Sequence, residues 1–339
     1  MKVTIHQFVL KFKEAFTISR GTRDHADSMI VALSDGVYTG YGEATANPYY
    51  HTTVEGMSVT VENLRPIIEE STASSPSEFW SKLQPHLSND PFVLCALDQA
   101  MHDLRARQAG KPLYALWGLE KDNLPITNYT IGIASIEKMI SKIKAQPWPI
   151  YKIKLGTDHD MEIVKALREH TDALFRIDAN CGWTVKETIE RAPLLKALGV
   201  EMIEQPLKAD DWEGMKEVFA KSILPVFADE SCCVEGDVKK CRKHFHGINI
   251  KLMKCGGITP ALRMIEEARQ YGLKVMVGCM TESSVGISAI AQLLPLLDAV
   301  DMDGALLVVN DPASGVRIEN GIVYYATGNG TGAELRDFI

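Results

Sequence analysis

Five charged residues recur along the chain at intervals of 22 to 26 residues, and each one ends a short run of apolar or β-branched residues. They are Lys154, Asp178, Glu204, Asp229 and Lys251. A β-strand with its return helix takes about 30 residues in a βαβ unit, so this period predicts successive parallel strands. The C-terminal ends of such strands meet at one mouth of a barrel. The spacing therefore predicts a polar site at that mouth.

Short strands alternate with helical stretches from about residue 124 onward. Eight strands are expected, near 128–133, 150–154, 174–178, 201–204, 225–229, 248–252, 274–279 and 299–303. Eight βα units of this kind fit an α/β fold of the (β/α)8 TIM type. The last unit is irregular, so a seven-helix or otherwise modified barrel fits equally well.

The segments on either side of the barrel predict an α+β capping domain. Residues 1–50 alternate like strands, with a hairpin turn at residues 34–36, and residues 53–118 show the apolar spacing of helices. Residues 315–339 contain a hairpin-like stretch and a Gly-rich tail, and we expect them to pack on the N-terminal part. The expected divisions are 1–120 for the capping domain, 121–314 for the barrel and 315–339 for the C-terminal segment.

The charge and the apolar pattern exclude several classes of partner. The chain of 339 residues has a net charge of −8 and no basic stripe, which argues against nucleic-acid binding. Its apolar runs are far shorter than the roughly 20 residues that cross a membrane, and its N-terminus lacks a signal-peptide pattern. Its seven cysteines include no CxxC pair, so reduced thiols are expected. We expect a cytoplasmic homo-oligomer.

Three carboxylates stand at the expected ends of neighbouring strands, at Asp178, Glu204 and Asp229. Carboxylates so close together repel one another unless a cation lies among them. An all-oxygen site suits Mg²⁺, or Mn²⁺, rather than zinc. Asn180 and Glu230 lie close by and could orient these ligands, or they could simply be polar loop residues. The sequence thus predicts a divalent cation and no organic cofactor.

Lysines accompany these carboxylates. Lys152 and Lys154 are two residues apart, so on a strand both point to the same side, either into the barrel or outward as a solvated pair. Inside the barrel, mutual repulsion is expected to lower the pKa of such ammonium groups and provide a base. Lys251 ends the sixth expected strand, which faces the second across the mouth. Lys254 is expected in the following loop, where a surface charge is its simplest role.

Two opposed amines can exchange the proton of an α-carbon that lies between them. One amine takes the proton from one face, and the other returns a proton to the opposite face, through an enediolate. The cation and Lys152 would stabilise the negative charge of that intermediate. Lys154 and Lys251 therefore predict a two-base racemase or epimerase.

Asp301 and Asp303 end the eighth expected strand and are again two residues apart. They could bind a cationic group at the far end of the substrate. The amine of a single α-amino acid lies too near its α-carbon to reach them, whereas a dipeptide could place its carboxylate on the cation and its N-terminal ammonium at this pair. The alternative is that the pair caps the turn at Gly304.

With these motifs, the chain resembles the muconate-lactonizing-enzyme-like branch of the enolase superfamily over nearly its whole length. The motifs are KIK at 152–154, DANCGW at 178–183, EQP at 204–206, ADES at 228–231 and NIKLMKCGG at 249–257. Residues 96–118 look like the end of the family's capping domain. The segment VDMDG at 300–304 is similar to the Asp-x-Asp motif of dipeptide epimerases. Sites of this superfamily use a Lys or His base with Mg²⁺.

The resemblance implies Mg²⁺-dependent epimerisation of dipeptides of the Ala-Xaa type at the C-terminal residue. Lys154 and Lys251 would transfer the protons, and Asp178, Glu204 and Asp229 would bind the cation. Substrate contacts are implied at Thr130, Lys152, Cys279, Thr281, Asp301 and Asp303. The family's mobile loop corresponds to the region of Arg20 and Arg23, which could bind a side-chain carboxylate such as that of Glu; a neutral second residue is the alternative. A muconate-type cycloisomerase or an o-succinylbenzoate synthase would share the cation and the lysines, and a non-catalytic barrel that binds ligands is the alternative from another class.

Overall fold

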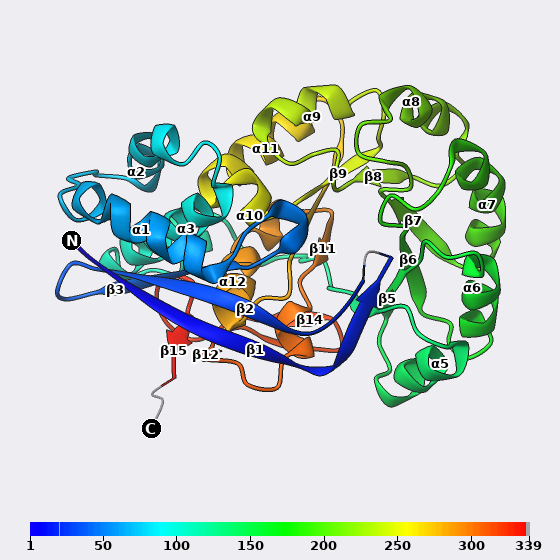
Figure 1. The fold of residues 1–339 in the computed structure, drawn as a ribbon, viewed down its shortest axis with the longest axis horizontal. Coiled ribbons are helices and arrows are strands. Elements are labelled where there is room, and N and C mark those ends of the chain that lie inside the picture. Colours follow the sequence, from blue (N-terminus) through cyan, green and yellow to red (C-terminus); the bar gives the residue numbers. More distant parts are fainter. Residues whose placement is uncertain (20, 337–339) are drawn as a thin grey trace.

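The computed structural model describes residues 1–19 and 21–336 of the chain. Figure 1 shows the N-terminal strands and helices lying beside a barrel whose helices form an outer arc. The predicted α/β fold, a modified barrel with an α+β capping domain, is confirmed. Arg20 lies outside the described residues, as do residues 337–339.

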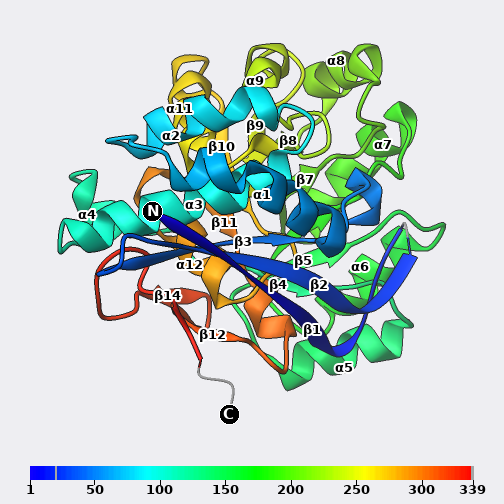
Figure 2. The same cartoon turned by 60° about the vertical axis from the view of Figure 1, so that its left-hand side comes forward.

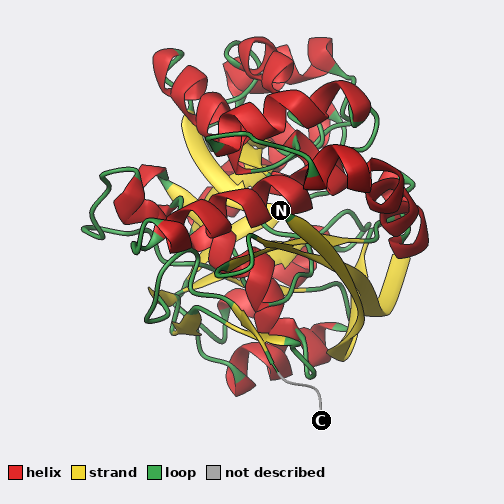
Figure 3. Cartoon of the chain, turned by 90° about the vertical axis from the view of Figure 1, so that its left-hand side faces the viewer, coloured by secondary structure: helices red, strands yellow, loops and turns green. Residues whose placement is uncertain are grey.

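The capping part begins with a three-stranded antiparallel sheet. Its strands are β1 (Lys2–Ile18), β2 (Gly21–Ser34) and β3 (Thr39–Thr45). Its helices are α1 (Val54–Glu69), α2 (Pro76–Leu83), α3 (Pro91–Gln108) and α4 (Leu113–Leu116), with 3₁₀ turns at Pro48–Tyr50 and Gln84–His86. Figures 2 and 3 show helices packed against the long N-terminal strands. Helix α3 can approach β3 closely because Gly42 has no side chain. A Cβ at Gly42 would lie only 2.0 Å from the carbonyl oxygen of Ala96.

The barrel consists of eight parallel strands in the order β11-β10-β9-β8-β7-β6-β5-β4. They are β4 (Tyr129–Ile131), β5 (Ile150–Lys154), β6 (Leu174–Asp178), β7 (Val200–Glu204), β8 (Val226–Ala228), β9 (Gly247–Ile250), β10 (Lys274–Gly278) and β11 (Ala299–Asp301). A single parallel bridge between Thr127 and Val300 joins the two edges of this sheet. All eight predicted strands are therefore confirmed, and the sheet is nearly closed.

Helices follow the strands on the outside of the barrel. They are α5 (Ile136–Ala145), α6 (Asp160–Arg168), α7 (Val185–Ala197), α8 (Trp212–Lys221), α9 (Glu235–Cys241), α10 (Leu252–Cys255), α11 (Ile258–Gln270) and α12 (Ser284–Ala291), with a 3₁₀ turn at Leu294–Leu296. Strand β11 is followed by the 3₁₀ helix η4 (Gly304–Leu307) in place of an α-helix. The last unit is thus modified, as its irregular sequence predicts. None of the described helices has the length and the apolarity needed to span a membrane.

The C-terminal segment contacts the capping part. It contains β12 (Ala313–Ser314), β13 (Arg317–Glu319), β14 (Ile322–Tyr324) and β15 (Glu334–Leu335), paired as β12–β15 and β13–β14. The amide of Thr331 donates to Asp103 Oδ1 of α3 at 2.6 Å, and Arg107 of α3 pairs with Glu334 at 2.5 Å. The division of the chain at residues 120 and 314 stays a prediction.

The alternation of side chains along the strands aims the charges into the barrel. In β5, the hydroxyl of Tyr151 donates outward to the carbonyl of Gln146 at 2.7 Å, so Lys152 and Lys154 face inward. Three apolar side chains stand two residues before Glu204, Asp229 and Asp301, and they pack together with Met276 of β10 beneath the mouth: Met202, Phe227 and Ala299. The barrel thus has a packed apolar layer that supports a charged layer at its mouth.

Candidate active site

The evenly spaced charges converge at the C-terminal ends of β5 to β9. Parallel pairing places Lys154 beside Asp178, and Asp178 beside Glu204. Lys154 Nζ donates to Asp178 Oδ2 at 2.6 Å, and Lys251 Nζ donates to Asp229 Oδ2 at 2.8 Å. Lys251 is half-buried, and the other four are buried. The structure therefore brings all five residues to one mouth.

The three carboxylates fit a hard divalent cation. Asp178, Glu204 and Asp229 can each direct one oxygen to a common region, with these oxygens within 4.8 Å of one another. The amide of Asn180 donates to Asp178 at 2.9 Å, and Asn249 Nδ2 donates to Glu204 at 2.9 Å. The buried Oδ1 of Asn180 accepts no hydrogen bond from the described residues, which leaves an oxygen for a polar ligand. This buried, all-oxygen set suits Mg²⁺.

Lys152 lies at the centre of the charged layer. Its Nζ is 2.7 Å from Glu204, 2.7 Å from Asp301 and 3.2 Å from Asp178. Burial lowers the pKa of Lys152, but Asp301 and its neighbours outweigh burial and raise that pKa well above its ordinary value. The prediction of a lowered pKa is therefore wrong for Lys152, because carboxylates surround it. It is suited to supply a fixed positive charge rather than to accept a proton.

Burial and neighbouring charges divide the carboxyl groups into two kinds. Burial raises the pKa of Asp178, but Lys154 and Lys152 outweigh it and hold that pKa well below its usual range. Burial, together with the charge of Asp178, raises the pKa of Glu204 to about 7. The two lysines therefore favour the ionised form of Asp178 more strongly than that of Glu204.

Lys254 is buried, and the prediction of a surface charge is wrong. The one-turn helix α10 folds its side chain back under Asp229. Lys254 Nζ donates to Asp229 Oδ1 and to the Asp229 carbonyl at 2.5 Å each, and to the carbonyl of Cys232 at 3.2 Å. Lys254 thereby fixes both the carboxylate and the backbone of a predicted metal ligand.

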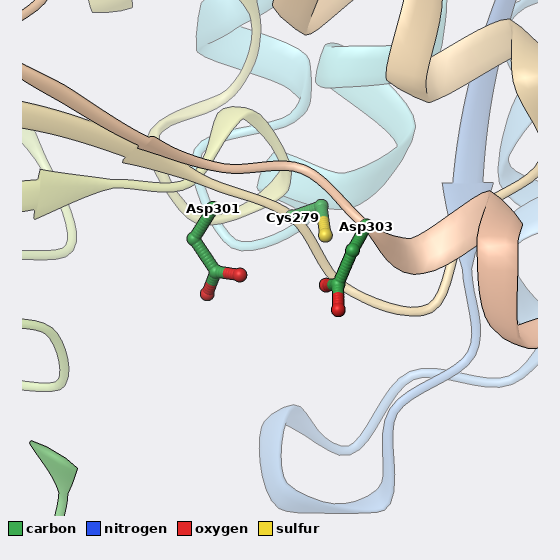
Figure 4. Close-up of side chains that lie close together, drawn as sticks. All are labelled: Cys279, Asp301 and Asp303. Atoms are coloured by element: carbon green, nitrogen blue, oxygen red, sulfur yellow. The ribbon is translucent and has the colours of Figure 1, made fainter. Parts of the chain in front are cut away.

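A second buried cluster follows β10 and β11. In Figure 4, the carboxylates of Asp301 and Asp303 and the thiol of Cys279 point into the same space. Asp303 accepts from the amide of Thr130 at 2.6 Å and from its hydroxyl at 3.2 Å. Burial, with the charge of Asp301, raises the pKa of Asp303 to about 7. The carboxylates of Asp301 and Asp303 thus point into one space, and their role as substrate ligands stays a prediction.

Lys152 connects Asp301 to the proposed metal ligands Asp178 and Glu204. It accepts from Lys152 Nζ at 2.7 Å and, on its other oxygen, from Asn128 Nδ2 at 2.7 Å. The strand order predicts this pair at the far end of the substrate from the cation, but Lys152 bridges Asp301 and Glu204. The positive charge of Lys152 is therefore shared between Asp301 and the carboxylates of the proposed metal site.

A cavity of about 450 Å³ opens over these groups. Its lining includes most of the predicted site residues: Arg23, Thr130, Lys154, Asp229, Lys251, Cys279, Thr281, Asp301 and Asp303. The capping part contributes apolar and aromatic walls: Phe12, Phe16, Ile18, Tyr49 and Tyr50. The tip of the β1–β2 hairpin is held at the mouth because the amide of Ile133 donates to the carbonyl of Thr17 at 2.8 Å. Lys152, Asp178 and Glu204 lie beneath this lining.

The sequence analysis missed the neutral residues that orient the carboxylates. Asn249 stands two residues before Lys251, so the period of a strand could have placed it inward, one layer below. Asn128 stands two residues before Thr130 in the same way. Neither residue carries a charge, and the search for strand-end charges passed over both.

Comparisons with known proteins agree with this architecture. Residues 1–118 match the "Mandelate racemase / muconate lactonizing enzyme, N-terminal domain" family, and residues 135–339 match the "Enolase C-terminal domain-like" family. The chain is 60% identical over 335 residues to the L-Ala-D/L-amino acid epimerase of Flavobacterium johnsoniae, covering 99% of this chain and 100% of that protein.

Two solved structures are also similar. The substrate-liganded L-Ala-D/L-Glu epimerase from Bacillus subtilis has a TM-score of 0.93 at 27% identity, covering 98% of this chain and 99% of that one. The dipeptide epimerase from Enterococcus faecalis, complexed with Mg and L-Leu-L-Tyr, has a TM-score of 0.91 at 32% identity, covering 98% of both chains. With both domains matched, this chain belongs to the mandelate racemase/muconate lactonizing enzyme family of the enolase superfamily.

Proposed function

We propose that this chain is an Mg²⁺-dependent dipeptide epimerase that inverts the C-terminal residue of Ala-Xaa dipeptides by two-base proton transfer. Its relatives named above are epimerases, a class of isomerase. The observation that carries the proposal is a single cavity lined by two lysines from β5 and β9 and by a buried Asp pair.

Lys154 and Lys251 transfer the protons in this proposal. Their strands, β5 and β9, are four positions apart in an eight-stranded sheet that is nearly closed, so the two amines approach a bound α-carbon from opposite faces. One amine removes the α-proton, and the other protonates the opposite face of the resulting enediolate. Lys152 stays protonated and stabilises the developing negative charge.

Asp178, Glu204 and Asp229 would hold the cation. A divalent cation there would neutralise negative charge that develops on the substrate carboxylate. The relative from Enterococcus faecalis was solved with Mg, which supports this choice of metal.

Asp301 and Asp303 bind the N-terminal ammonium of the dipeptide. They are buried, they line the cavity, and Lys152 stands between Asp301 and the carboxylates of Asp178 and Glu204. Arg23 also lines the cavity and would pair with an acidic second residue, whereas the aromatic walls would suit an apolar one. The substrate range is therefore set where the capping part meets the barrel.

The proposal is tested with deuterium. Dipeptides of L,L and mixed stereochemistry are incubated in D₂O with Mg²⁺ and enzyme, and α-deuteration is measured by mass spectrometry. Asp303→Asn should lower kcat/KM for dipeptides by about 100-fold, because an ammonium loses a charged, buried partner. Calorimetry should show unchanged Mg²⁺ binding. Asp303 is preferred to Asp301 as the first variant because Asp301 also pairs with Lys152.

The control is Asp122→Asn, which removes an exposed carboxylate and should leave turnover intact. Unchanged kinetics in Asp303→Asn would contradict a dipeptide substrate and favour a cycloisomerase or synthase, whose substrates carry no ammonium. No exchange with any carboxylate substrate would favour a barrel that only binds ligands.

A further inference from the structure

Two glutamates face each other at the boundary between the capping part and the barrel. Glu43 lies on β3, and Glu282 lies in the segment that joins β10 to α12. Their exposed fractions are 0% and 3%. Neither forms an ion pair with a lysine, arginine or histidine among the described residues. Two buried carboxylates without a cationic partner are unfavourable unless hydrogen bonds stabilise the charge or one of the groups is protonated.

Glu43 has the hydrogen-bond donors that a carboxylate needs, although burial raises its pKa. Its Oε1 accepts from Ser28 Oγ at 2.7 Å and from the amide of Ser283 at 2.9 Å. Its Oε2 accepts from Ser283 Oγ at 2.6 Å and from the amide of Gly286 at 2.9 Å. These donors include the first turn of α12, whose N-terminus favours a negative charge. Both oxygens of Glu43 are therefore satisfied as a carboxylate.

Glu282 has the opposite environment. Its Oε1 accepts only from the amide of Met280, at 2.7 Å, and its buried Oε2 has no hydrogen-bond partner among the described residues. An ideal Cβ on Gly286 would lie 2.1 Å from this Oε2 and 3.2 Å from Oε2 of Glu43. The two carboxyl groups thus meet over one glycine, so ionised Glu282 would be both desolvated and repelled.

The charged and titratable groups around Glu282 do not offset the cost of ionising it. They are Glu43 on β3, Lys251 at the end of β9, and the thiols of Cys95 on α3 and Cys279 in the same segment. Burial, followed by the charge of Glu43, raises the pKa of Glu282 to about 8, and Lys251 opposes this only in part. The neutral acid is the form that fits the site at neutral pH.

Glu282 ends a wall of the substrate cavity. Cys279, Met280 and Thr281 line the cavity. The amide of Cys279 is held by the carbonyl of Asp301 at 2.8 Å, and the amide of Met280 is held by Glu282. The segment is therefore attached to β11 at one end and, through the bonds from Ser283 to Glu43, to the capping part at the other.

We propose that Glu282 is a positioning residue that works as the neutral acid: its protonated carboxyl packs over Gly286 beside the Glu43 carboxylate and holds the Cys279–Thr281 wall against the substrate. Loss of its proton would set two like charges face to face, and the wall would move away from the bound dipeptide. The inference rests on the proposed function only for its kinetic readout.

The protonation state is measured without substrate. Mg²⁺-loaded protein carrying ¹³C-carboxyl glutamate is titrated from pH 5 to 9.5 by NMR, and the resonance absent from Glu282→Gln is assigned to Glu282. We expect this resonance to be that of a neutral acid at pH 7 and to titrate above it. A Glu282 resonance that is already ionised at pH 7 would overturn the proposal, whatever the enzyme's substrate is.

The positioning role is measured by the pH dependence of KM. Wild-type KM for the best dipeptide should rise about tenfold between pH 7 and 9, with kcat changed less. Glu282→Gln mimics the neutral acid, so its KM should stay within about twofold of the wild type at pH 7 and should not rise. Gly286→Ala places a methyl group where Oε2 lies and should raise KM at pH 7 already.

Glu266→Gln, which removes an exposed carboxylate on α11, is the matched control and should follow the wild type. An equal rise of KM in the wild type and in Glu282→Gln would overturn the positioning role. Should Gly286→Ala fail to fold, the comparison of wild type with Glu282→Gln decides alone.

Discussion

At the scale of single residues, the mouth is built from pairs of opposite charge rather than from isolated groups. Lys154 pairs with Asp178, and Lys251 pairs with Asp229, so each proposed base forms an ion pair with a proposed metal ligand. Burial lowers the pKa of Lys251, but Asp229 outweighs it and raises that pKa in the metal-free protein. A cation bound to Asp229 would weaken the ion pair between Asp229 and Lys251 and would thereby lower the pKa of Lys251. In the proposed enzyme, the two lysines would therefore respond to the cation and would act from opposite faces of the substrate.

Replacing either lysine should separate the two half-reactions. Lys154→Ala and Lys251→Ala should each lower epimerisation by about 10²–10⁴-fold, the usual contribution of a general acid or base. Each variant should still exchange the α-proton of one stereoisomer, because the other lysine still reaches that face. Deuterium uptake from both stereoisomers, followed by mass spectrometry, checks this, with the double variant as a blank. Equal residual exchange from both isomers in one variant would contradict two opposed bases.

At the scale of elements, the strands could be predicted because most of them are apolar runs that end at a charged residue. Each strand begins within one residue of its expected position, because an apolar run marks every strand and a charge at or directly after the last residue marks β5 to β9 and β11. The period of a strand also placed Lys152 and Lys154 together. Lys254 could not be placed in this way, because the one-turn helix α10 reverses the chain after β9, and nothing in the residue spacing signals such a short turn. The roles of Glu43 and Glu282 depend on contacts between distant segments, which periodicity does not reveal.

The turn at α10 makes a prediction about Lys254. Lys254→Met should lower the free energy of unfolding by about 3–5 kcal/mol, because it leaves Asp229 Oδ1 and two backbone carbonyls without their buried cationic donor, while Lys251 still pairs with Oδ2. It should also weaken Mg²⁺ binding, because Asp229 loses the contact that fixes it. Urea denaturation and calorimetry measure the two effects. Lys240→Met, at an exposed lysine that pairs with Asp237, should change neither, and a stable Lys254→Met with unchanged Mg²⁺ affinity would contradict the role given to Lys254.

At the scale of the whole molecule, buried acids join the capping part to the barrel. Glu43 of β3 receives the first turn of α12, and Asp98 of α3 accepts from the amide and the hydroxyl of Thr259 on α11 at 2.8 and 2.6 Å. The substrate cavity lies along the same boundary, with walls from both parts. Substrate binding and the stability of the boundary therefore depend on overlapping groups.

This boundary should make the whole fold less stable as the pH rises. The pKa of Glu282 is about 8 in the folded protein against 4.5 for an ordinary glutamate, so the folded state holds an extra proton between these values and stability falls as the pH rises through them. Between pH 6.5 and 8.5 the loss due to Glu282 should be about 2 kcal/mol. Buried His102, whose pKa burial lowers to about 3, opposes this loss by only about 0.4 kcal/mol, because an unfolded histidine is half protonated at about pH 6.5 and neutral at about pH 8.5.

Urea denaturation at constant ionic strength should show this loss in the wild type and in Glu266→Gln. Glu282→Gln has no proton to lose, so its free energy of unfolding should fall by about 2 kcal/mol less over the same range. Parallel pH curves for the wild type and Glu282→Gln would mean that Glu282 is ionised in the folded protein. In that case the boundary would have to tolerate two facing carboxylates, and the capping part could not be held by a neutral acid.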